Sequence, residues 1–406
     1  MAWCERVAFE DRSGRKRHQF LRDVSRGRGA HPEVGAVELA AGKSRRARTG
    51  KDPVATIRDV ARVSRVSIAT VSRVFNNSSR VSDPTRRRVL AAAKRVAYWP
   101  NATARSLITS RTHTLGLLLP DLHGEFFSEM IRGIDLAART VRFSLLVSRS
   151  SSRADELTTA VRSMRGRVDG IVVMAPDLDD SSVLGQCAGH VPVVLINAEI
   201  HVPGCHSLKF DNLGGALAVT QHLIELGHRR IATLHGPPHN IDARERLEGY
   251  RMALMRSGLT PEPALEIQGT FGERSGYEAA QALVALQPRA TAVFVANDHM
   301  AVGLMSALHD LGLQIPRDIA MAGFDDIPMA RFLTPPLTTV HLDVEELGRR
   351  AVRFLLDPTR LRVADEQQDM VPVTLVVRSS CGASAAGSPA NRWSPRHASG
   401  SGPGSV

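Results

Sequence analysis

Residues 56–76 read TIRDVARVSRVSIATVSRVFN, and this stretch decides how the first part of the chain folds. Thr56 and Asp59 form a capping pair, which predicts a short helix over Ile57–Val63. The apolar spacing further along predicts a second helix over Ile68–Phe75. Only three residues separate the two predicted helices, and this is the spacing of a helix-turn-helix.

A third helix is predicted to begin at Ser82-Asp83-Pro84, because proline is favoured at the first helical position. Its residues Val89, Leu90, Ala93 and Val96 recur at core spacing, so three short helices would share one small core. The segment is also strongly basic: residues 54–112 carry a net charge of +10, whereas residues 113–380 carry −7. This asymmetry favours a nucleic-acid-binding head on a body with another task, although a solvated basic face gives the same charge count.

The body, residues 113–380, alternates short apolar runs with helical stretches of about 12–16 residues. Continuous apolar strands between amphipathic helices predict parallel sheets that are covered on both faces, and the length predicts two such lobes. Ligands of open α/β sheets bind beyond the carboxyl ends of the strands, so we expect a binding cleft between the lobes. The predicted strands are Leu115–Leu119, Phe143–Val147, Gly170–Met174, Val193–Ile196, Ile231–Leu234, Ala292–Val295 and Ile319–Ala322.

The two ends of the chain lack this patterning. Residues 1–53 are predicted to form a basic disordered extension, and residues 381–406 a flexible tail rich in Ser, Gly, Pro and Ala. We find no secretory signal and no apolar run of about 18 residues, and therefore expect a cytoplasmic protein that does not enter a membrane. The four cysteines lack zinc-type spacing and are expected to be incidental thiols, with no metal or cofactor.

A series of motifs in order along residues 54–380 resembles the LacI/GalR family of bacterial transcription regulators. The resemblance implies a small all-α helix-turn-helix head on an α/β body like the periplasmic binding proteins, built of two doubly wound parallel-sheet lobes. The motifs are Thr56–Ala61, Val66–Asn76, Pro100-Asn101, Ala104–Leu107, Phe126-Phe127, Gly227–Ile231, Arg246–Tyr250, Ala296–Asp298, Gly323–Asp326 and Leu337–Val340.

The same resemblance implies the domain boundaries. We expect a DNA-binding head over 54–100, a hinge helix and linker over 101–112, and an effector-binding and dimerisation domain over 113–380. The chain is expected to cross between the lobes near residues 211, 314 and 343. The N-lobe would then contain about 113–211 plus 315–342, and the C-lobe about 212–314 plus 343–380.

The resemblance also implies which residues contact DNA. Side chains at the start of a recognition helix contact base edges, while neighbouring groups contact phosphates. The base-facing candidates are Ile68, Ala69, Arg73 and Arg80; the phosphate candidates are Thr56, Ser67, Thr70, Ser72 and Asn76; and the hinge helix, Ala102–Leu107, adds Arg105 and the apolar wedge Leu107. At the turn between the helices, Arg65 stands where the family commonly has Gly or Asn, and we expect a slightly strained turn. Alternatively, Ser67 only caps its helix and residues 101–112 are a plain linker.

In the cleft, the resemblance implies that Arg246 and Asp298 form a polar clamp on a small molecule, which we expect to be a sugar or sugar derivative. Phe126 and Phe271 are expected to stack on the ligand or flank it, and the other candidates are Asp121, Phe127 and Asn240. Structural roles are the alternative: Arg246 could be a surface charge, Asp298 a helix cap, and Phe126 and Phe127 core residues. Glu125 stands where many relatives have Pro, so the shape of this loop is open.

These features predict a homodimeric regulator that binds a near-palindromic double-stranded DNA operator under the control of an effector. Such regulators are more often repressors than activators. An enzyme is disfavoured, because the chain has no Gly-rich nucleotide loop, no Gly-x-Ser-x-Gly elbow and no His/Cys cluster, and thus no catalytic residue is predicted. An exported sugar-binding protein is disfavoured by the missing signal. The remaining alternative is a small-molecule-binding protein with a degenerate DNA head.

Overall fold

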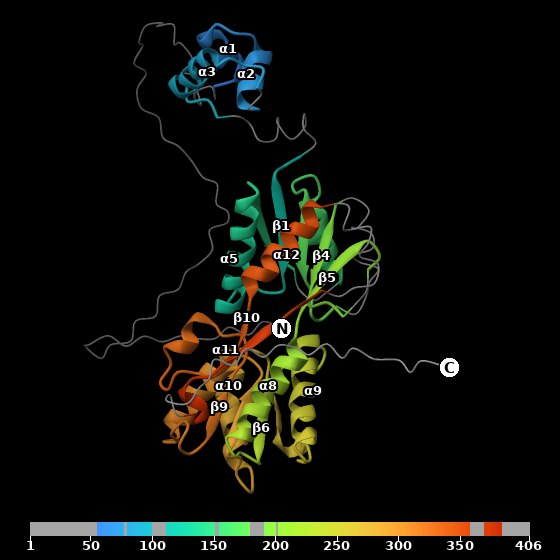
Figure 1. Ribbon diagram of the computed structural model, residues 1–406, viewed down its shortest axis with the longest axis vertical. Helices are drawn as coiled ribbons and strands as arrows, with labels where there is room; N and C mark the ends of the chain where they lie inside the picture. The colour runs from blue at the N-terminus through green and yellow to red at the C-terminus, as the bar shows by residue number, and fades with distance from the viewer. Residues whose placement is uncertain are drawn as a thin grey trace, which may run out of the picture. The chain divides into compact units, whose positions relative to one another are not determined.

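The computed structural model describes residues 55–76, 79–99, 111–150, 154–178, 191–199, 202–357 and 369–383. The chain divides into a small helical head and a larger α/β body (Figure 1). The head consists of α1 (Ile57–Ser64), α2 (Ile68–Phe75) and α3 (Asp83–Arg95), which confirms the three predicted helices. The predicted extension, hinge helix and most of the tail lie outside the described residues.

Local hydrogen bonds explain where the helices of the head begin. The Asp59 carboxylate accepts hydrogen bonds from the Thr56 backbone N–H at 3.0 Å and from its hydroxyl at 2.7 Å, and these bonds lower the pKa of Asp59. The Ser67 hydroxyl accepts from the Thr70 backbone N–H at 3.1 Å, as expected of a helix cap. Arg65 ends α1 in the left-handed region with φ 53° and ψ 45°, a conformation that costs a non-glycine residue about 1 kcal/mol.

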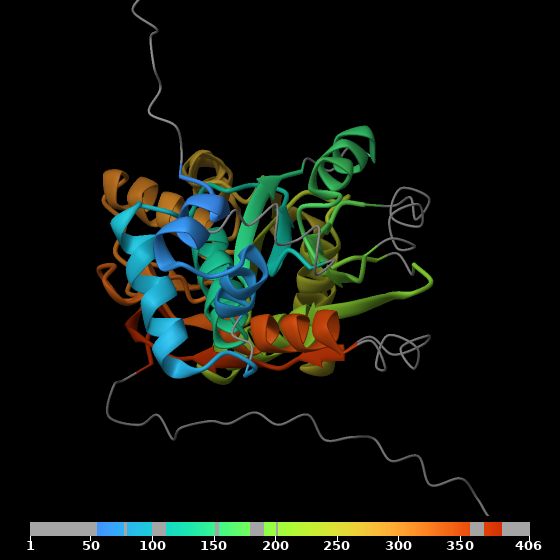
Figure 2. The ribbon, with the colours of Figure 1, turned by 90° about the horizontal axis from the view of Figure 1, so that it is seen from above.

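The N-lobe of the body is a six-stranded, all-parallel sheet in the order β11-β5-β4-β3-β1-β2. Helices α5 and α12 pack together on one side, and Figure 2 shows α12 and α6 on opposite sides of the strands. The sheet is therefore doubly wound, as predicted. The elements are β1 (Thr114–Leu119), α5 (Glu125–Thr140), β2 (Ser144–Arg149), α6 (Ala154–Met164), β3 (Gly170–Met174), β4 (Val193–Ile196), β5 (Cys205–Phe210), α12 (Val344–Leu356) and β11 (Asp369–Val371).

The C-lobe is a four-stranded parallel sheet in the order β7-β6-β8-β9. Two helix pairs cover it, α8 with α9 and α10 with α11 (Figure 1). Its elements are α8 (Asn212–Glu225), β6 (Ile231–His235), α9 (Ile241–Arg256), β7 (Glu266–Gln268), α10 (Glu273–Ala285), β8 (Ala292–Val295), α11 (Asp298–Asp310) and β9 (Ala320–Ala322), with 3₁₀ turns η1 (Pro263–Leu265), η2 (Pro328–Arg331) and η3 (Ser379–Cys381).

The chain crosses between the lobes at three places, which corrects one prediction and the lobe boundaries built on it. Asp211 links β5 to α8, and Asp343 links β10 (Thr339–Leu342) to α12, both as predicted. Each of the two carboxylates caps the helix that follows, at 2.8 Å from the N–H of the third helical residue. The predicted crossing near 314 is wrong, because β9 pairs with β8 inside the C-lobe sheet.

The third crossing instead connects β11 to β12 (Val373–Val376), which pairs with β10 in an antiparallel ribbon. The segment 315–342 therefore belongs largely with the C-lobe, and α12 with β11 belongs with the N-lobe. The prediction had assigned these two segments the other way round. Strand order is set by tertiary pairing, and the apolar pattern of a single strand does not reveal it.

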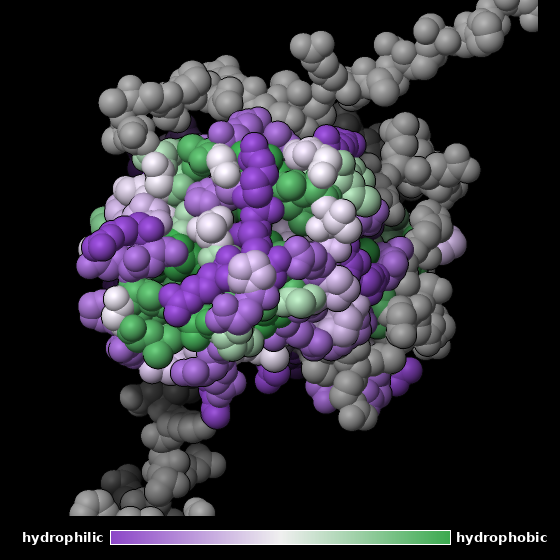
Figure 3. Space-filling view, turned by 90° about the horizontal axis from the view of Figure 1, so that it is seen from below, coloured by the Kyte–Doolittle hydropathy of each residue, from purple (hydrophilic) through white to green (hydrophobic). Residues whose placement is uncertain are grey.

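The surface of the body mixes polar and apolar side chains. Figure 3 shows the lower face of the C-lobe, where hydrophobic side chains gather in separate areas between hydrophilic ones. Among the helices of the described residues, none has the length and apolar character that a bilayer span requires.

Candidate functional site

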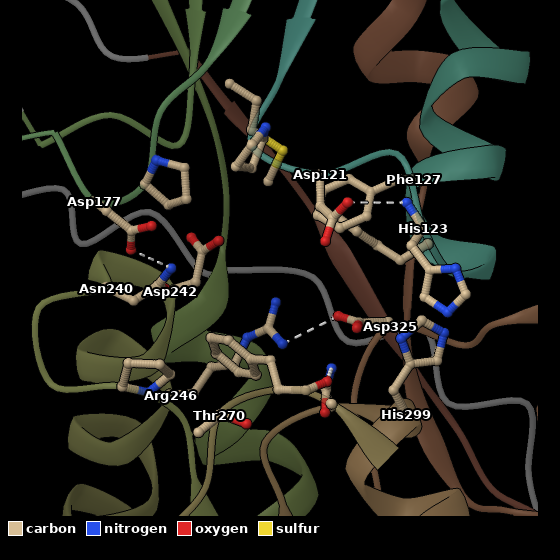
Figure 4. Close-up of a pocket in the computed structure, with 18 of the residues that line it drawn as sticks. Asp121, His123, Phe127, Asp177, Asn240, Asp242, Arg246, Thr270, His299 and Asp325 are labelled. Atoms are coloured by element: carbon tan, nitrogen blue, oxygen red, sulfur yellow. Dashed lines mark hydrogen bonds and ion pairs between the residues drawn. The ribbon is translucent and has the colours of Figure 1, made fainter. Parts of the chain in front are cut away.

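A cavity of about 310 Å³ lies between the two lobes of the body, and residues from both lobes line it (Figure 4). It lies beyond the carboxyl ends of β1 and β3 from the N-lobe and of β6 and β8 from the C-lobe, where ligands of parallel α/β sheets bind. Six of the seven predicted effector residues line this cavity: Asp121, Phe126, Phe127, Asn240, Arg246 and Phe271.

Arg246, on α9, is the buried cation of the cavity, with 3% of its surface exposed. Its Nε donates to Asn212 Oδ1 at 2.9 Å and its Nη1 to the carbonyl oxygen of Ala296 at 2.6 Å. The guanidinium also lies 3.8 Å from the centre of the Phe324 ring. These contacts hold the guanidinium in one orientation and exclude the alternative of a surface charge.

The carboxylate that pairs with Arg246 is that of Asp325, with Oδ1 3.0 Å from Nη1 (Figure 4). The contact has the distance of an ion pair, but Oδ1 is buried and accepts no well-aligned hydrogen bond within the described structure. Burial raises the pKa of Asp325 to about 6, although Arg246 acts in the opposite direction. Asp325 lines the cavity, so the site presents a buried carboxylate in its wall to which a ligand hydroxyl could donate.

Asp298, predicted as the clamp carboxylate, does not line the cavity and is fully buried below it. Its Oδ1 accepts from the Thr339 hydroxyl at 2.7 Å, and its Oδ2 accepts from the backbone N–H of Ile327 at 3.0 Å. Burial is the main reason why its pKa is raised well above the usual value, and the nearby Asp325 raises it further. The expected clamp of Arg246 and Asp298 is therefore corrected: Arg246 and Asp325 line the cavity, and Asp298 does not.

Asn297, the residue before Asp298, does line the cavity and was not predicted. Its side-chain oxygen caps α11 by accepting from the Met300 N–H at 3.0 Å, and its Nδ2 donates to the Phe271 carbonyl at 2.9 Å. It lies in the same motif as Asp298, and the sequence gives no sign of which of the two side chains reaches the cavity.

A second buried carboxylate, Asp242, joins the lobes beside Arg246. Asn197, which follows β4 of the N-lobe, donates to it at 3.2 Å, and Asn212 of the C-lobe donates at 2.9 Å. Burial raises the pKa of Asp242, and the charge of Arg246 opposes this shift. Neither Asp242 nor Asn197 was predicted, because an isolated Asp on a helix and an Asn after a strand carry no sequence signal.

At one edge of the cavity, Asn240 Nδ2 donates to Asp177 Oδ1 across the lobes at 2.7 Å (Figure 4). The predicted Asn240 thus acts in the structure as a cap of α9 and as an interlobe contact. Asp121 is exposed at the rim, where its carboxylate accepts from the backbone N–H groups of Leu122 and His123.

Three phenylalanines supply apolar surface. Phe271 has a positive φ of 67° and its ring lies over Gly236, where a Cβ would come within 2.3 Å of the ring. Gly236 thus makes room for the aromatic face. The rings of Phe126 and Phe127 meet edge to face at 5.2 Å, and both also pack on the core of the body. A flat apolar face beside convergent carboxylates suits a ligand with one apolar face and several hydroxyl groups.

The lining is acidic as a whole. Five carboxylates face or border the cavity, against the single guanidinium of Arg246, which is already paired. The carboxylates are those of Asp121, Asp177, Asp242, Glu273 and Asp325. Such a site accepts hydrogen bonds from hydroxyl groups and repels phosphate or carboxylate groups.

In the head, the start of α2 presents the predicted base-reading residues to solvent. Ile68, Ala69 and Arg73 are exposed, and Ile68 is unusual as a large apolar side chain with 45% exposure. The hydroxyls of Ser67 and Thr70 lie 2.9 Å apart, and Asn76 Nδ2 lies 3.4 Å from the Ser72 hydroxyl.

The other predicted DNA contacts have less structural support. The Thr56 hydroxyl is bonded to Asp59, and Arg80 is exposed beyond α2. Arg105 and Leu107 lie outside the described residues. The DNA roles of all these residues stay predictions.

Two family models match the chain, one for the bacterial regulatory proteins of the lacI family over residues 56–101 and one for a periplasmic binding protein-like domain over 220–381. The ribose operon repressor of Escherichia coli (strain K12) is 38% identical over 331 residues, which are 80% of this chain and all of that protein. The transcriptional repressor PurR of Haemophilus influenzae (strain PittEE) is 36% identical over 338 residues, which are 80% of this chain and 98% of that protein.

Solved structures give the same result. A lac repressor dimer bound to operator and an anti-inducer matches with a TM-score of 0.73 and 32% identity, over 81% of this chain and 99% of that one. A LacI-family regulator from Enterococcus faecium with bound ribose matches with a TM-score of 0.59 and 26% identity, over 66% of this chain and 98% of that one. Together with the head and the two-lobed body, these matches show that the chain belongs to the LacI family of bacterial regulatory proteins, which are DNA-binding regulators of transcription.

Proposed function

We propose that the protein is a homodimeric repressor whose operator affinity is controlled by an uncharged polyhydroxylated effector, of the size of a monosaccharide, bound between the lobes. The observation that carries the effector class is the buried pair of Arg246 and Asp325 in an otherwise acidic cavity. Hydroxyl groups can donate to the carboxylates and accept from the guanidinium, whereas an anionic group would face several carboxylates.

Two relatives support the choice of a sugar. One is a ribose operon repressor, and one solved regulator of the family contains bound ribose. Control of DNA binding then follows from lobe movement, since the ligand contacts both lobes and three chain crossings connect them. A ligand shifts such an equilibrium only by the difference in its affinity for the two states.

The homodimer is supported by the lac repressor dimer and by exposed apolar side chains on both lobes of this chain. Leu136 and Leu146 are exposed on the N-lobe, and Leu311 and Phe332 on the C-lobe. A symmetric pair of heads would bind a near-palindromic operator. Because the partner is chromosomal DNA and the relatives are bacterial repressors, we propose that the protein acts in the cytoplasm as a regulator rather than as an enzyme.

The test has two steps. An unbiased selection of double-stranded oligonucleotides with the full chain should return one near-palindromic sequence, and binding to it should weaken steeply with salt. Thermal shift and operator titration should then compare D-ribose, ribose 5-phosphate and hypoxanthine. We expect D-ribose to stabilise the protein and to change operator affinity about 5- to 150-fold, and ribose 5-phosphate to do neither. Stabilisation by the phosphate or the purine alone would refute the effector class, and no sequence preference would leave only a ligand-binding protein with a degenerate head.

A further inference from the structure

The N-terminus of α5 is capped by the other lobe. Helix N-termini leave backbone N–H groups without partners inside the helix, and Gly124, which precedes α5, has no side chain to satisfy them. The backbone N–H of Glu125, the first residue of α5, donates instead to Nε2 of His299 at 3.3 Å. His299 lies on α11 of the C-lobe, so this cap spans the two lobes.

The side chain of Glu125 also contacts the C-lobe. Its Oε2 accepts a hydrogen bond from the backbone N–H of Met329 at 2.8 Å, in the short turn η2. Each lobe therefore satisfies a backbone N–H of the other through a side chain.

The packing around these bonds allows little freedom. A Cβ at Gly124 would lie 2.3 Å from Cε1 of His299, so the imidazole rests directly on the N-lobe backbone. His299 also lines the cavity, and Figure 4 shows it beside Asp325. The contact lies at the edge of the cavity away from the interlobe bond of Asp177 with Asn240, so the cavity is bridged on two sides.

We propose that Glu125 and His299 form an interlobe clasp that holds the lobes together over the cavity and so sets the affinity for the effector. Both of its hydrogen bonds join different lobes, and both must break when the lobes separate. Glu125 and His299 are therefore positioning residues. The inference concerns lobe closure, and only its consequence for affinity rests on the proposed function.

Amide hydrogen exchange of the full-length protein tests the clasp without a ligand. In the Glu125→Ala variant, the Met329 N–H loses its acceptor, and we expect peptides that contain Met329 to exchange about three- to tenfold faster at constant pH. Glu125→Gln keeps an acceptor oxygen at the same position and should exchange like the wild type. In the His299→Ala variant, the peptide that contains the Glu125 N–H should accelerate by a similar factor.

The matched control is Glu129→Ala, which removes a carboxylate one turn further along α5. Glu129 binds Arg132 on its own helix, so exchange at Met329 should not change. Wild-type exchange in Glu125→Ala, or equal acceleration in Glu125→Ala, Glu125→Gln and Glu129→Ala, would overturn the clasp.

Titration with D-ribose measures the consequence. The dissociation constant should rise in Glu125→Ala by about the factor seen in exchange and stay unchanged in Glu125→Gln. If the wild type does not bind D-ribose, the proposed effector is wrong, while the exchange rates still decide the clasp by themselves.

Discussion

Arg246 Nη1 lies 3.0 Å from Asp325 Oδ1 in the wall of the interlobe cavity, and the two side chains come from segments about 80 residues apart in the chain. Both side chains are almost fully buried, so their charges are screened little by solvent. A ligand that donates to the Asp325 carboxylate would exploit a group already desolvated in the folded protein. The pair therefore joins two segments of the C-lobe in the wall of the cavity.

Replacing Arg246 should separate ligand recognition from DNA binding. Arg246→Lys keeps the charge but loses the planar donor fork, and we expect effector affinity to fall about 10- to 100-fold with operator affinity retained. The control is Arg251→Ala on the same helix, whose side chain pairs with Glu266 away from the cavity. Isothermal titration measures the effector affinity, and operator gel shifts measure the operator affinity. Equal effector affinity in Arg246→Lys and wild type would remove Arg246 from the site.

Substitutions of Asp325 and of Asp298 should have different effects: the first on effector binding and the second on the stability of the fold. Asp325→Asn is expected to weaken effector binding with little loss of stability. Asp298→Ala leaves the Thr339 hydroxyl and the Ile327 N–H buried without partners, at a cost of about 1–3 kcal/mol for each group, and should lower the melting temperature by several degrees. Calorimetry and ligand titration distinguish the two. Loss of the effector response in Asp298→Ala at an unchanged melting temperature would show that Asp298 contacts the ligand after all.

Effector binding should weaken in acid because of Asp325. Its pKa of about 6 lies above the value of 3.8 in the unfolded chain. The folded state therefore holds this proton more tightly, and the stability that protonation supplies is lost as the pH rises through about 6. A ligand hydroxyl donates more strongly to the ionised carboxylate, and at pH 5 only about one tenth of it is ionised, so affinity should fall by up to about tenfold from pH 7.5 to pH 5. The Asp325→Asn variant retains every histidine of the cavity and should show a flat profile; a parallel decline would assign the effect to those histidines.

Arg73 should govern which DNA sequence is bound. Arg73→Ala is expected to lose about 1–3 kcal/mol of discrimination against mismatched sites while keeping salt-sensitive non-specific binding. Arg62→Ala is the control, because Arg62 is also exposed in the head but pairs with Asp59 on α1. Competition binding with selected and scrambled oligonucleotides measures the ratio of the two DNA affinities. An unaltered site preference in Arg73→Ala would contradict its base-reading role.

The sequence predicted the elements of the fold better than their arrangement. Continuous apolar runs such as Gly170–Met174 are read directly as buried strands, and the structure has this strand with the same bounds. The polar residues His206 and Lys209 interrupt the apolar pattern of β5, so the sequence does not indicate this strand. Both side chains are nevertheless buried in the structure. The lobe to which β9 belongs depends on its pairing with β8, which no local pattern encodes.

The same limit applies to the site. The sequence motif identifies Arg246, but the chain offers three carboxylates as candidate partners, those of Asp298, Asp325 and Asp326. Asp298 turns inward to Thr339, and Asp326 pairs with Arg378. Asp325 alone of the three lines the cavity, where its backbone has a φ of 110°. This choice is made by backbone geometry and burial, which residue identity does not reveal.

The most direct measurement is the affinity of the full-length protein for its selected operator, by fluorescence anisotropy, with and without saturating D-ribose, in the wild type and in Arg246→Lys. We expect equal operator affinity without sugar, a change of at least about fivefold with sugar in the wild type, and no change in the variant at the same sugar concentration. A sugar response of the same size in both proteins would mean that the ligand acts somewhere other than the cavity between the lobes.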